Sequence, residues 1–178
     1  MKIIFLDIDG VLNSRKYLKE HCVDTSGKFS LEHEIDIYKV IMLCNWLNKH
    51  YDVEICLSSS WRTGWGNTPV SIALNRLFNK HDVFIKYFTP SRVNQPEEIK
   101  KMSSTELFNA NIMFGRSLEI KAWLEEHRNV TEWCAVDDDD CDMLLAIESK
   151  RFVHTSFYSD DGGLMPEHIK QIEKILKE

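Results

Sequence analysis

The sequence lacks paired cysteines, an excess of basic residues and long apolar runs. Its five cysteines form no Cys-x-x-Cys pair, and no two of its seven histidines lie within five positions of each other, so the spacing typical of a structural zinc site is missing. Lys and Arg number 22 against 28 Asp and Glu. The resulting net charge of −6 disfavours general nucleic-acid binding, which depends on cations at the phosphates.

The chain also lacks an apolar stretch near the ~20 residues that span a bilayer. Its first apolar run, Ile3-Ile4-Phe5-Leu6, is shorter than the ~7–15 residues of a signal-peptide core. The number of cysteines is odd, and Cys44, Cys56 and Cys134 lie inside apolar segments, as is typical of a reducing compartment. We therefore expect a cytoplasmic protein without a membrane segment.

The composition that is present, 178 residues with 43% apolar and 28% charged side chains, indicates one globular domain over residues 1–178. Hydrophobic periodicity and turn residues set the expected elements. Predicted strands cover residues 2–7, 53–57, 83–88, 132–136 and about 151–155. Predicted helices cover residues 32–50, 70–80, 118–127, about 141–149 and the segment from Pro166 to the C-terminus, with Ser117 as a helix N-cap.

Strands that alternate with helices predict an α/β fold, a three-layer Rossmann-like sandwich around a central, mostly parallel five-stranded sheet. We expect residues 10–31 to form a flap, with 14–31 as a loop, and about 61–115 to contain a small insert or lid. Such sheets bind ligands beyond the carboxyl ends of their strands. The predicted strands end in polar residues at Asp7, Ser58 and Asp137.

Two acidic motifs follow predicted strands. Asp7-Ile8-Asp9-Gly10 ends the first strand, and residues 137–140 are four consecutive Asp. Clustered like charges are costly unless a cation neutralises them, so both motifs favour a shared metal ion. The alternatives are an Asp-Gly turn and a solvated acidic turn at a helix start. A calcium loop is excluded, because its sixth position would hold Asp142 where glycine is required.

A hydroxyl and a cation complete the pattern. Ser58 stands in Leu-Ser-Ser-Ser-Trp-Arg and offers a hydroxyl to a phosphoryl oxygen, with a Ser-rich turn as the alternative. Arg116 precedes a predicted helix and could reach the same edge of the sheet, with an exposed arginine as the alternative. The order of carboxylates, hydroxyl, cation and carboxylates, each at the end of an element, favours one site.

This order resembles the haloacid dehalogenase (HAD) superfamily of phosphohydrolases, over nearly the whole chain. More narrowly, the sequence resembles the HAD domains of "Swiss Army knife" RNA repair proteins. The motifs that carry the resemblance are Phe-Leu-Asp-Ile-Asp-Gly-Val-Leu-Asn, Leu-Ser-Ser-Ser-Trp-Arg, Gly115-Arg116 with Glu119-Ile120 and Trp123-Leu124, and Val-Asp-Asp-Asp. The resemblance implies a HAD fold with a minimal cap.

The resemblance also implies roles in catalysis and phosphate binding. Asp7 matches the nucleophile that forms an aspartyl-phosphate, and Asp9 matches the general acid/base. Ser58 matches the phosphate-binding hydroxyl, with Ser59 as a second candidate because the end of the strand is uncertain. Arg116 matches the basic residue of the family, with Lys121 as the fallback.

The metal ligands implied by the resemblance are Asp7, the main-chain carbonyl of Asp9, and Asp138, with Asp137 beside it. Asp142 matches the later acid of a spaced version of the last motif. Because four Asp follow one another, the motif can be aligned with this run in two ways that differ by one residue. Two like charges 4 Å apart repel by ~4 kcal/mol at an effective dielectric constant of 20, so an anionic nucleophile needs a cation to meet a phosphate. Oxygen ligands point to Mg²⁺.

The substrate is less well defined by the sequence. Between residues 61 and 115 there are seven Lys or Arg and four acids, an excess of 7 − 4 = 3 positive charges that suits an anionic ligand. Trp61, Arg62 and Trp65 are candidates for stacking on a base or sugar phosphate, with packing of the two tryptophans as the alternative. We expect a phosphorylated small molecule or nucleotide, with nucleic-acid ends as a further candidate.

Two other functions remain open at this stage. One is a receiver-like phosphoacceptor that switches without turnover, although the predicted third strand ends in Thr89-Pro90 where a receiver carries its acceptor Asp. The other is a non-catalytic binding module on the same fold. The leading prediction is a Mg²⁺-dependent phosphomonoesterase.

Overall fold

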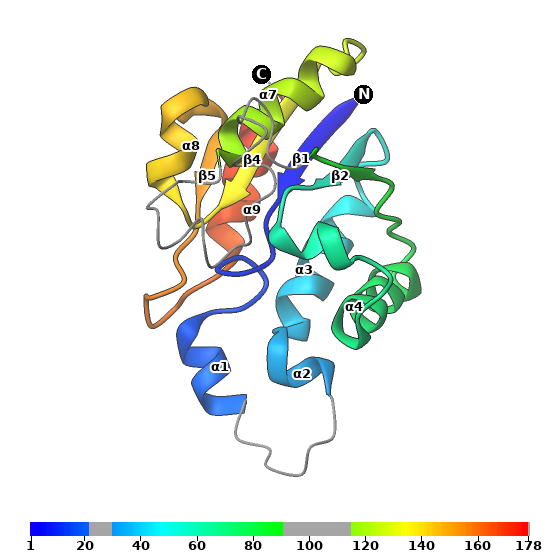
Figure 1. Cartoon of the computed structure of the whole chain (residues 1–178), viewed down its shortest axis with the longest axis vertical. Coiled ribbons are helices and arrows are strands. Elements are labelled where there is room, and N and C mark those ends of the chain that lie inside the picture. The colour runs from blue at the N-terminus through cyan, green and yellow to red at the C-terminus, as the bar shows by residue number, and fades with distance from the viewer. Residues whose placement is uncertain (22–29, 91–114, 178) are drawn as a thin grey trace, which may run out of the picture.

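Five strands form one parallel sheet in the computed structural model (Figure 1). The structure describes residues 1–21, 30–90 and 115–177, apart from the side chains of residues 141, 142 and 145. The order of strands across the sheet is β3-β2-β1-β4-β5, and each pairing is parallel. The strands are β1 (Lys2–Leu6), β2 (Val53–Leu57), β3 (Tyr87–Phe88), β4 (Glu132–Asp137) and β5 (Phe152–His154).

Apolar side chains on both faces of β1 place this strand at the centre of the molecule. Ile4 and Leu6 belong to one buried cluster, whereas Ile3 and Phe5 belong to another. Because successive side chains of a strand point to opposite faces, a strand that is apolar throughout must be covered on both sides.

Helices supply the two covering layers. The cluster around Ile4 and Leu6 includes residues of α3 (Ile37–Leu47), α4 (Pro69–Lys80) and α9 (Pro166–Ile175). The cluster around Ile3 and Phe5 includes residues of α7 (Arg116–Glu126) and α8 (Asp140–Ala146). The predicted three-layer Rossmann-like α/β architecture is therefore confirmed.

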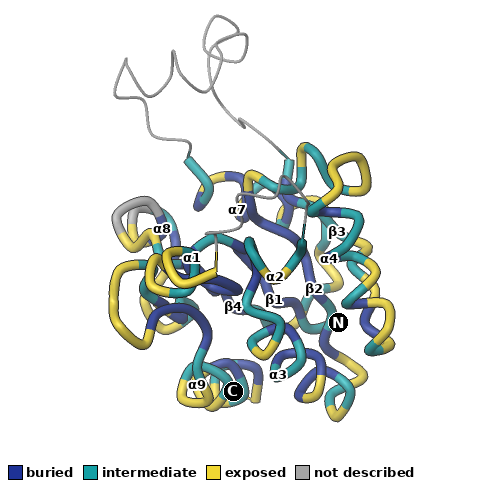
Figure 2. The backbone as a smooth tube through the Cα atoms, turned by 90° about the horizontal axis from the view of Figure 1, so that it is seen from below, coloured by how far each residue is buried: buried dark blue, intermediate teal, exposed yellow. Residues whose placement is uncertain are grey.

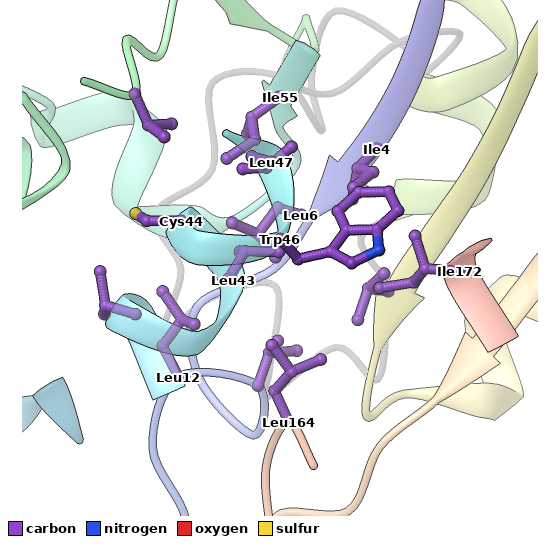
Figure 3. Packing of buried hydrophobic residues seen from close by; sticks show 14 of the residues in the cluster. Ile4, Leu6, Leu12, Leu43, Cys44, Trp46, Leu47, Ile55, Leu164 and Ile172 are labelled. Atoms are coloured by element: carbon purple, nitrogen blue, oxygen red, sulfur yellow. The ribbon is translucent and has the colours of Figure 1, made fainter. Parts of the chain in front are cut away.

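The first of these clusters is shown in Figure 3, where Leu43 and Leu47 of α3 lie near Ile4 and Leu6 of β1. Each fully buried aliphatic side chain contributes roughly 1.5–3 kcal/mol relative to its exposed state. Figure 2 shows the buried strands within a rim of exposed helix surface. Cys44, Cys56 and Cys134 are free thiols buried in these clusters, as their apolar surroundings predicted.

The remaining described helices are short. α1 (Arg15–His21) and α2 (Leu31–Glu34) follow β1 and lie beyond the carboxyl end of the sheet (Figure 1). Of the two 3₁₀ turns, η1 (Ser60–Gly64) follows β2 and η2 (Ser149–Arg151) precedes β5. Among the described residues, no helix has the length and apolar character needed to cross a membrane.

The single helix predicted over residues 32–50 is wrong in its first part. The structure has α2 and α3 instead, separated by Ile35 and Asp36 in extended conformation. The Asp36 N–H bonds to the Leu12 carbonyl at 2.9 Å, and the Asp36 side chain caps α3 by accepting the Tyr38 N–H. A hydrogen bond to a distant segment thus interrupts a helix that periodicity alone would continue.

Two other boundaries also differ. The predicted loop 14–31 contains α1, whose Arg15 N–H bonds to the distant Phe157 carbonyl at 2.8 Å. The predicted strand 83–88 is reduced to Tyr87–Phe88, because the Val83 N–H bonds to the Phe78 carbonyl and closes the end of α4.

The N-cap prediction at Ser117 is wrong by two residues. α7 starts at Arg116, and its N-cap is Gly115, whose φ of 63° lies in the left-handed region that favours glycine. The predicted start at Pro166 is confirmed for α9. The predicted flap and insert fall partly on residues 22–29 and 91–114, which lie outside the described residues, so this division of the chain stays a prediction.

Candidate active site at the carboxyl ends of the strands

Three carboxylates meet where β1 and β4 end. Asp7 follows β1 directly, Asp137 is the last residue of β4, and Asp138 comes next. Each offers an oxygen within 4.8 Å of the other two. The two strands are neighbours in the sheet, so their carboxyl ends bring together residues that are far apart in the sequence.

Arg116, the first residue of α7, lies between two of these carboxylates. Its Nη1 is 3.0 Å from Asp7 Oδ2 and 2.6 Å from Asp137 Oδ2. Asp137 also accepts the Asp139 N–H at 2.9 Å. Lys121, the fallback for the basic residue, is exposed farther along α7. The geometry therefore favours Arg116 as the cation of this site.

Burial of these charges shifts their pKa values. Burial raises the pKa of Asp7 and of Asp137 above the ordinary range of aspartate, and the neighbouring Arg116 only partly offsets this effect. Burial and the charge of Asp7 raise the pKa of Asp138 to about 6. Burial lowers the pKa of Arg116, but Asp7 and Asp137 outweigh it and raise that pKa. The single arginine leaves a net negative cluster.

Gly10 allows Asp138 to approach the first motif. A Cβ on Gly10 would lie 2.3 Å from Cγ of Asp138, and the φ of Gly10 is 71°. The Gly10 carbonyl accepts a hydrogen bond from Thr155 at 2.8 Å, and His154 Nε2 lies 3.1 Å from the Asp138 carbonyl. The glycine of the Asp-x-Asp-Gly motif is thus required for close packing of the two acidic loops.

Asp9 is held by two N–H donors. Trp61 Nε1 donates to Asp9 Oδ2 at 2.9 Å, and Asn13 Nδ2 donates to Asp9 Oδ1 at 3.0 Å. Asn13 also accepts the Gly10 N–H at 2.9 Å, which folds the motif back on itself. The side chain of Asp9 is therefore oriented beside the carboxylate cluster without belonging to it.

The two serine candidates have different surroundings. Within the described part of the chain, Ser58 Oγ is buried and has no hydrogen-bond partner. Ser59 accepts the Trp61 N–H at 3.4 Å, and its hydroxyl acts to lower the pKa of Asp7. A buried hydroxyl without a partner is suited to a bound ligand, so Ser58 is the better placed of the two serines to contact one.

A buried ion pair joins the loop after β2 to α7. Arg62 Nη2 is 2.6 Å from Glu119 Oε2, and their side chains are only 10% and 4% exposed. Arg62 Nη1 also donates to the Ser59 carbonyl at 2.6 Å. Because Glu119 lies three residues after Arg116, this pair holds the helix that presents the cation of the site.

The donor set fits a hard divalent cation. The group formed by Asp7, Asp137 and Asp138 offers only oxygen ligands, which suit Mg²⁺ better than zinc. Asp7 Oδ1 is buried and has no hydrogen-bond partner among the described residues, as expected of an oxygen placed to bind a cation or substrate. These residues could hold Mg²⁺.

The run of four Asp divides at the end of β4. Asp137 and Asp138 lie at the cluster, whereas Asp139 and Asp140 are exposed, and Asp140 begins α8. The alternative interpretation of this run, a solvated acidic turn, therefore fits only Asp139 and Asp140. The side chain of Asp142, the other acid considered, lies outside what the structure describes.

Three contacts of the site were not predicted from the sequence. Trp61 was expected to stack on a ligand or to pack, but the indole packs against the core and also donates to Asp9. The contacts of Asn13 with Asp9 and of Arg62 with Glu119 were not expected. The signal that could have indicated them is the position of these residues within the motifs that carry the family resemblance. Trp65 packs near Phe88, with ring centroids 6.3 Å apart.

Comparison with known proteins identifies the family. Searches of curated proteins and of solved structures gave no match to the chain. The family model described as the HAD domain in Swiss Army Knife RNA repair proteins matches residues 3–169, which include Asp7, Asp9, Ser58, Arg116, Asp137 and Asp138 of the site. The chain therefore belongs to the family of HAD domains found in Swiss Army Knife RNA repair proteins.

Proposed function

We propose that this HAD domain is a Mg²⁺-dependent phosphomonoesterase that works through an aspartyl-phosphate. Membership in the family indicates a phosphohydrolase-type function, and the acidic cluster fits it. The observation that carries the proposal is the position of Arg116, which contacts Asp7 and Asp137 beside Asp138.

Asp7 is the proposed nucleophile. Its carboxylate is buried, one oxygen contacts Arg116, and the other has no partner within the described residues. That oxygen would attack phosphorus, forming the Asp7–phosphate bond while the bond to the leaving oxygen breaks. Arg116 would stabilise negative charge on the phosphoryl oxygens, and Ser58 would donate a hydrogen bond to one of them.

Asp9 is the proposed general acid/base. In the first step it gives its proton to the leaving oxygen, and in the second it takes a proton from the water that attacks the aspartyl-phosphate. That attack releases inorganic phosphate and restores Asp7. Trp61 and Asn13 hold the two oxygens of Asp9, so its side chain is positioned before substrate binds.

Mg²⁺ would be held by Asp7, Asp138 and the main-chain carbonyl of Asp9, with Asp137 beside them. When bound, it neutralises charge on the phosphate and on the acidic cluster. Without such a cation, three carboxylates against one arginine would repel a dianionic substrate.

The proposed substrates are nucleotide or polynucleotide end phosphates. The family description, which names RNA repair proteins, supports this class. The basic excess between residues 61 and 115 also suits a polyanionic ligand.

The proposal is tested by steady-state hydrolysis of an aryl phosphate. We expect turnover with Mg²⁺, its loss on chelation, and a fall of at least ~10³-fold in kcat for Asp7→Asn, because the covalent step is removed. Asp140→Asn is the matched control, since Asp140 is an exposed member of the same acidic run. We expect this control variant to hydrolyse the substrate at the wild-type rate.

Unchanged turnover by a folded Asp7→Asn variant would exclude Asp7 as the nucleophile. Wild-type protein that binds phosphorylated oligonucleotides in a salt-sensitive manner without hydrolysing any phosphate would instead be a binding module. Stable phosphorylation by a small phosphodonor, again without turnover, would indicate a phosphoacceptor.

A further inference from the structure

A cavity of about 350 Å³ lies between α2 and the start of α4, and one of its walls is Trp61, the residue that donates to Asp9. Trp61, Val70 and Glu34 line it, together with Gly64 and the hydroxyl residues Ser60, Thr63, Thr68 and Ser71. This volume is within the range of small-molecule sites, which run from ~300 to ~1,000 Å³.

Hydrogen bonds connect the walls of this cavity to the proposed acid. Trp61 donates directly to Asp9 Oδ2. Asn13, which donates to Asp9 Oδ1, also donates to the Glu34 carbonyl at 3.1 Å. The leaving oxygen must come within hydrogen-bond distance of Asp9 to receive its proton. The rest of the leaving group therefore begins next to this cavity.

Three of the four hydroxyl groups that line the cavity are engaged with the protein itself. Thr63 donates to the Ser60 carbonyl at 2.9 Å, and Ser71 donates to the Gly64 carbonyl at 2.9 Å. Thr68 donates to Ser71 at 2.8 Å. These groups shape the wall, so they are not the main source of polar contacts for a ligand.

Glu34 provides the charge of the cavity, and Trp61 provides an aromatic wall. No hydrogen bond or ion pair to the Glu34 carboxylate is present among the described residues. A carboxylate accepts N–H and O–H donors and repels phosphate, whereas an indole favours contact with a ring. The lining thus suits an uncharged ring that carries hydrogen-bond donors.

We propose that this cavity binds the ring of the leaving group, a nucleobase or a sugar, and that the Glu34 carboxylate accepts hydrogen bonds from that ring. This inference rests on the proposed phosphatase function. It assigns the leaving-group side of the site to α2, η1 and the start of α4.

Kinetics on substrates with and without a ring test this assignment. The substrates are nucleoside monophosphates, sugar phosphates and acetyl phosphate, whose leaving group has no ring. For Glu34→Gln we expect KM for the ring-bearing substrates to rise about 10-fold relative to KM for acetyl phosphate, because a hydrogen bond to a charged acceptor is weakened. The effect of Glu34→Gln on KM for nucleoside monophosphates, compared with its effect on KM for sugar phosphates, shows which ring the cavity accepts.

Glu32→Gln is the matched control. Glu32 lies two residues from Glu34 on α2, is exposed and is absent from the cavity lining, so we expect unchanged KM for every substrate. Glu34→Lys should raise kcat/KM for a nucleoside 3′,5′-bisphosphate relative to the monophosphate, because it reverses the charge of the cavity.

A binding measurement separates failure of this inference from failure of the proposed function. Calorimetric titration of Asp7→Asn with a nucleoside monophosphate should give a Kd that Glu34→Gln raises about 10-fold. Hydrolysis of acetyl phosphate with no effect of Glu34→Gln on ring-bearing substrates would overturn the inference and leave the function intact. Nucleotide binding that depends on Glu34 without hydrolysis of any substrate would overturn the leaving-group assignment together with the function.

Discussion

Gly10 is the residue at which the two acidic motifs come into contact. It lies between Asp9 and the turn closed by Asn13, and its missing Cβ leaves the space that Asp138 occupies. One hydrogen atom in place of a methyl group thus determines whether the carboxylates of β1 and β4 can converge.

Gly10→Ala should therefore affect both stability and activity. The added Cβ would lie 2.3 Å from Asp138, so that side chain must move. We expect kcat to fall by roughly 100-fold, as for a catalytic group displaced by about 1 Å, and the free energy of unfolding to fall by more than ~1 kcal/mol. Phosphatase assays and urea unfolding measure the two effects.

Gly66→Ala separates backbone strain from the clash. Gly66 has a similar φ of 77°, but nothing lies within 4 Å of an added Cβ. We expect this variant to lose only about 1 kcal/mol of stability and no activity. Equal losses of activity in the two variants would show that displacement of Asp138 is not the cause.

At the scale of elements, α7 is fixed by a charged contact in the protein interior. Arg62 bonds both to Glu119 of α7 and to the carbonyl of Ser59, so it links the end of β2 to this helix. Removing one partner of a buried pair leaves the other charge without compensation.

Glu119→Gln should lower the free energy of unfolding by roughly 3 kcal/mol, because the Arg62 guanidinium stays buried without its counter-charge. We also expect kcat to fall, since α7 presents Arg116 to Asp7. Chemical denaturation and steady-state kinetics measure these changes. Glu148→Gln, at an exposed pair with Lys150, should leave the denaturation midpoint unchanged.

The double variant Arg62→Met with Glu119→Leu tests what the pair contributes beyond stability. Replacing a buried ion pair by apolar side chains of similar volume is often neutral for folding. We expect stability to recover while kcat stays low. Recovery of both would mean that the pair does not position Arg116.

The placement of the site on the elements could be predicted from the sequence because it follows from the topology. Carboxyl ends of parallel strands meet at one edge, so Asp7, Ser58 and Asp137 were expected together. The split between α2 and α3 could not be predicted, because it depends on a bond from Asp36 to the distant Leu12. Which of the four Asp reach the cluster could not be predicted either, because it depends on where β4 ends. The cavity lined by Glu34 depends on the packing of segments that are distant in the sequence.

At the scale of the whole molecule, the acidic cluster makes stability depend on pH. Burial and the charge of Asp7 raise the pKa of Asp138 to about 6, and burial raises the pKa of Asp7 as well. Between pH ~4, where aspartate ordinarily titrates, and pH 6, the folded chain binds more protons than the unfolded chain. Stability of the metal-free protein therefore falls as pH rises through this interval.

Thermal denaturation with a chelator should show this fall, on the order of 5 °C between pH 4 and pH 6. Mg²⁺ competes with protons for the same oxygens, so its addition should raise Tm more at pH 7 than at pH 5. Asp138→Asn should reduce both the pH dependence and the effect of Mg²⁺. A metal-free Tm that is constant or rises over this range would contradict the assigned burial of charge.

The position of β1 in the sheet has a consequence for synthesis of the chain on the ribosome. β1 is made before β4, the strand with which it pairs on one side, and β4 comprises Glu132–Asp137. Until those residues emerge, the nascent chain exposes an apolar strand edge, the kind of surface that promotes aggregation. Expression yield of this protein should therefore respond to chaperones that bind unfinished chains, and ribosome stalling before β4 should leave the product insoluble.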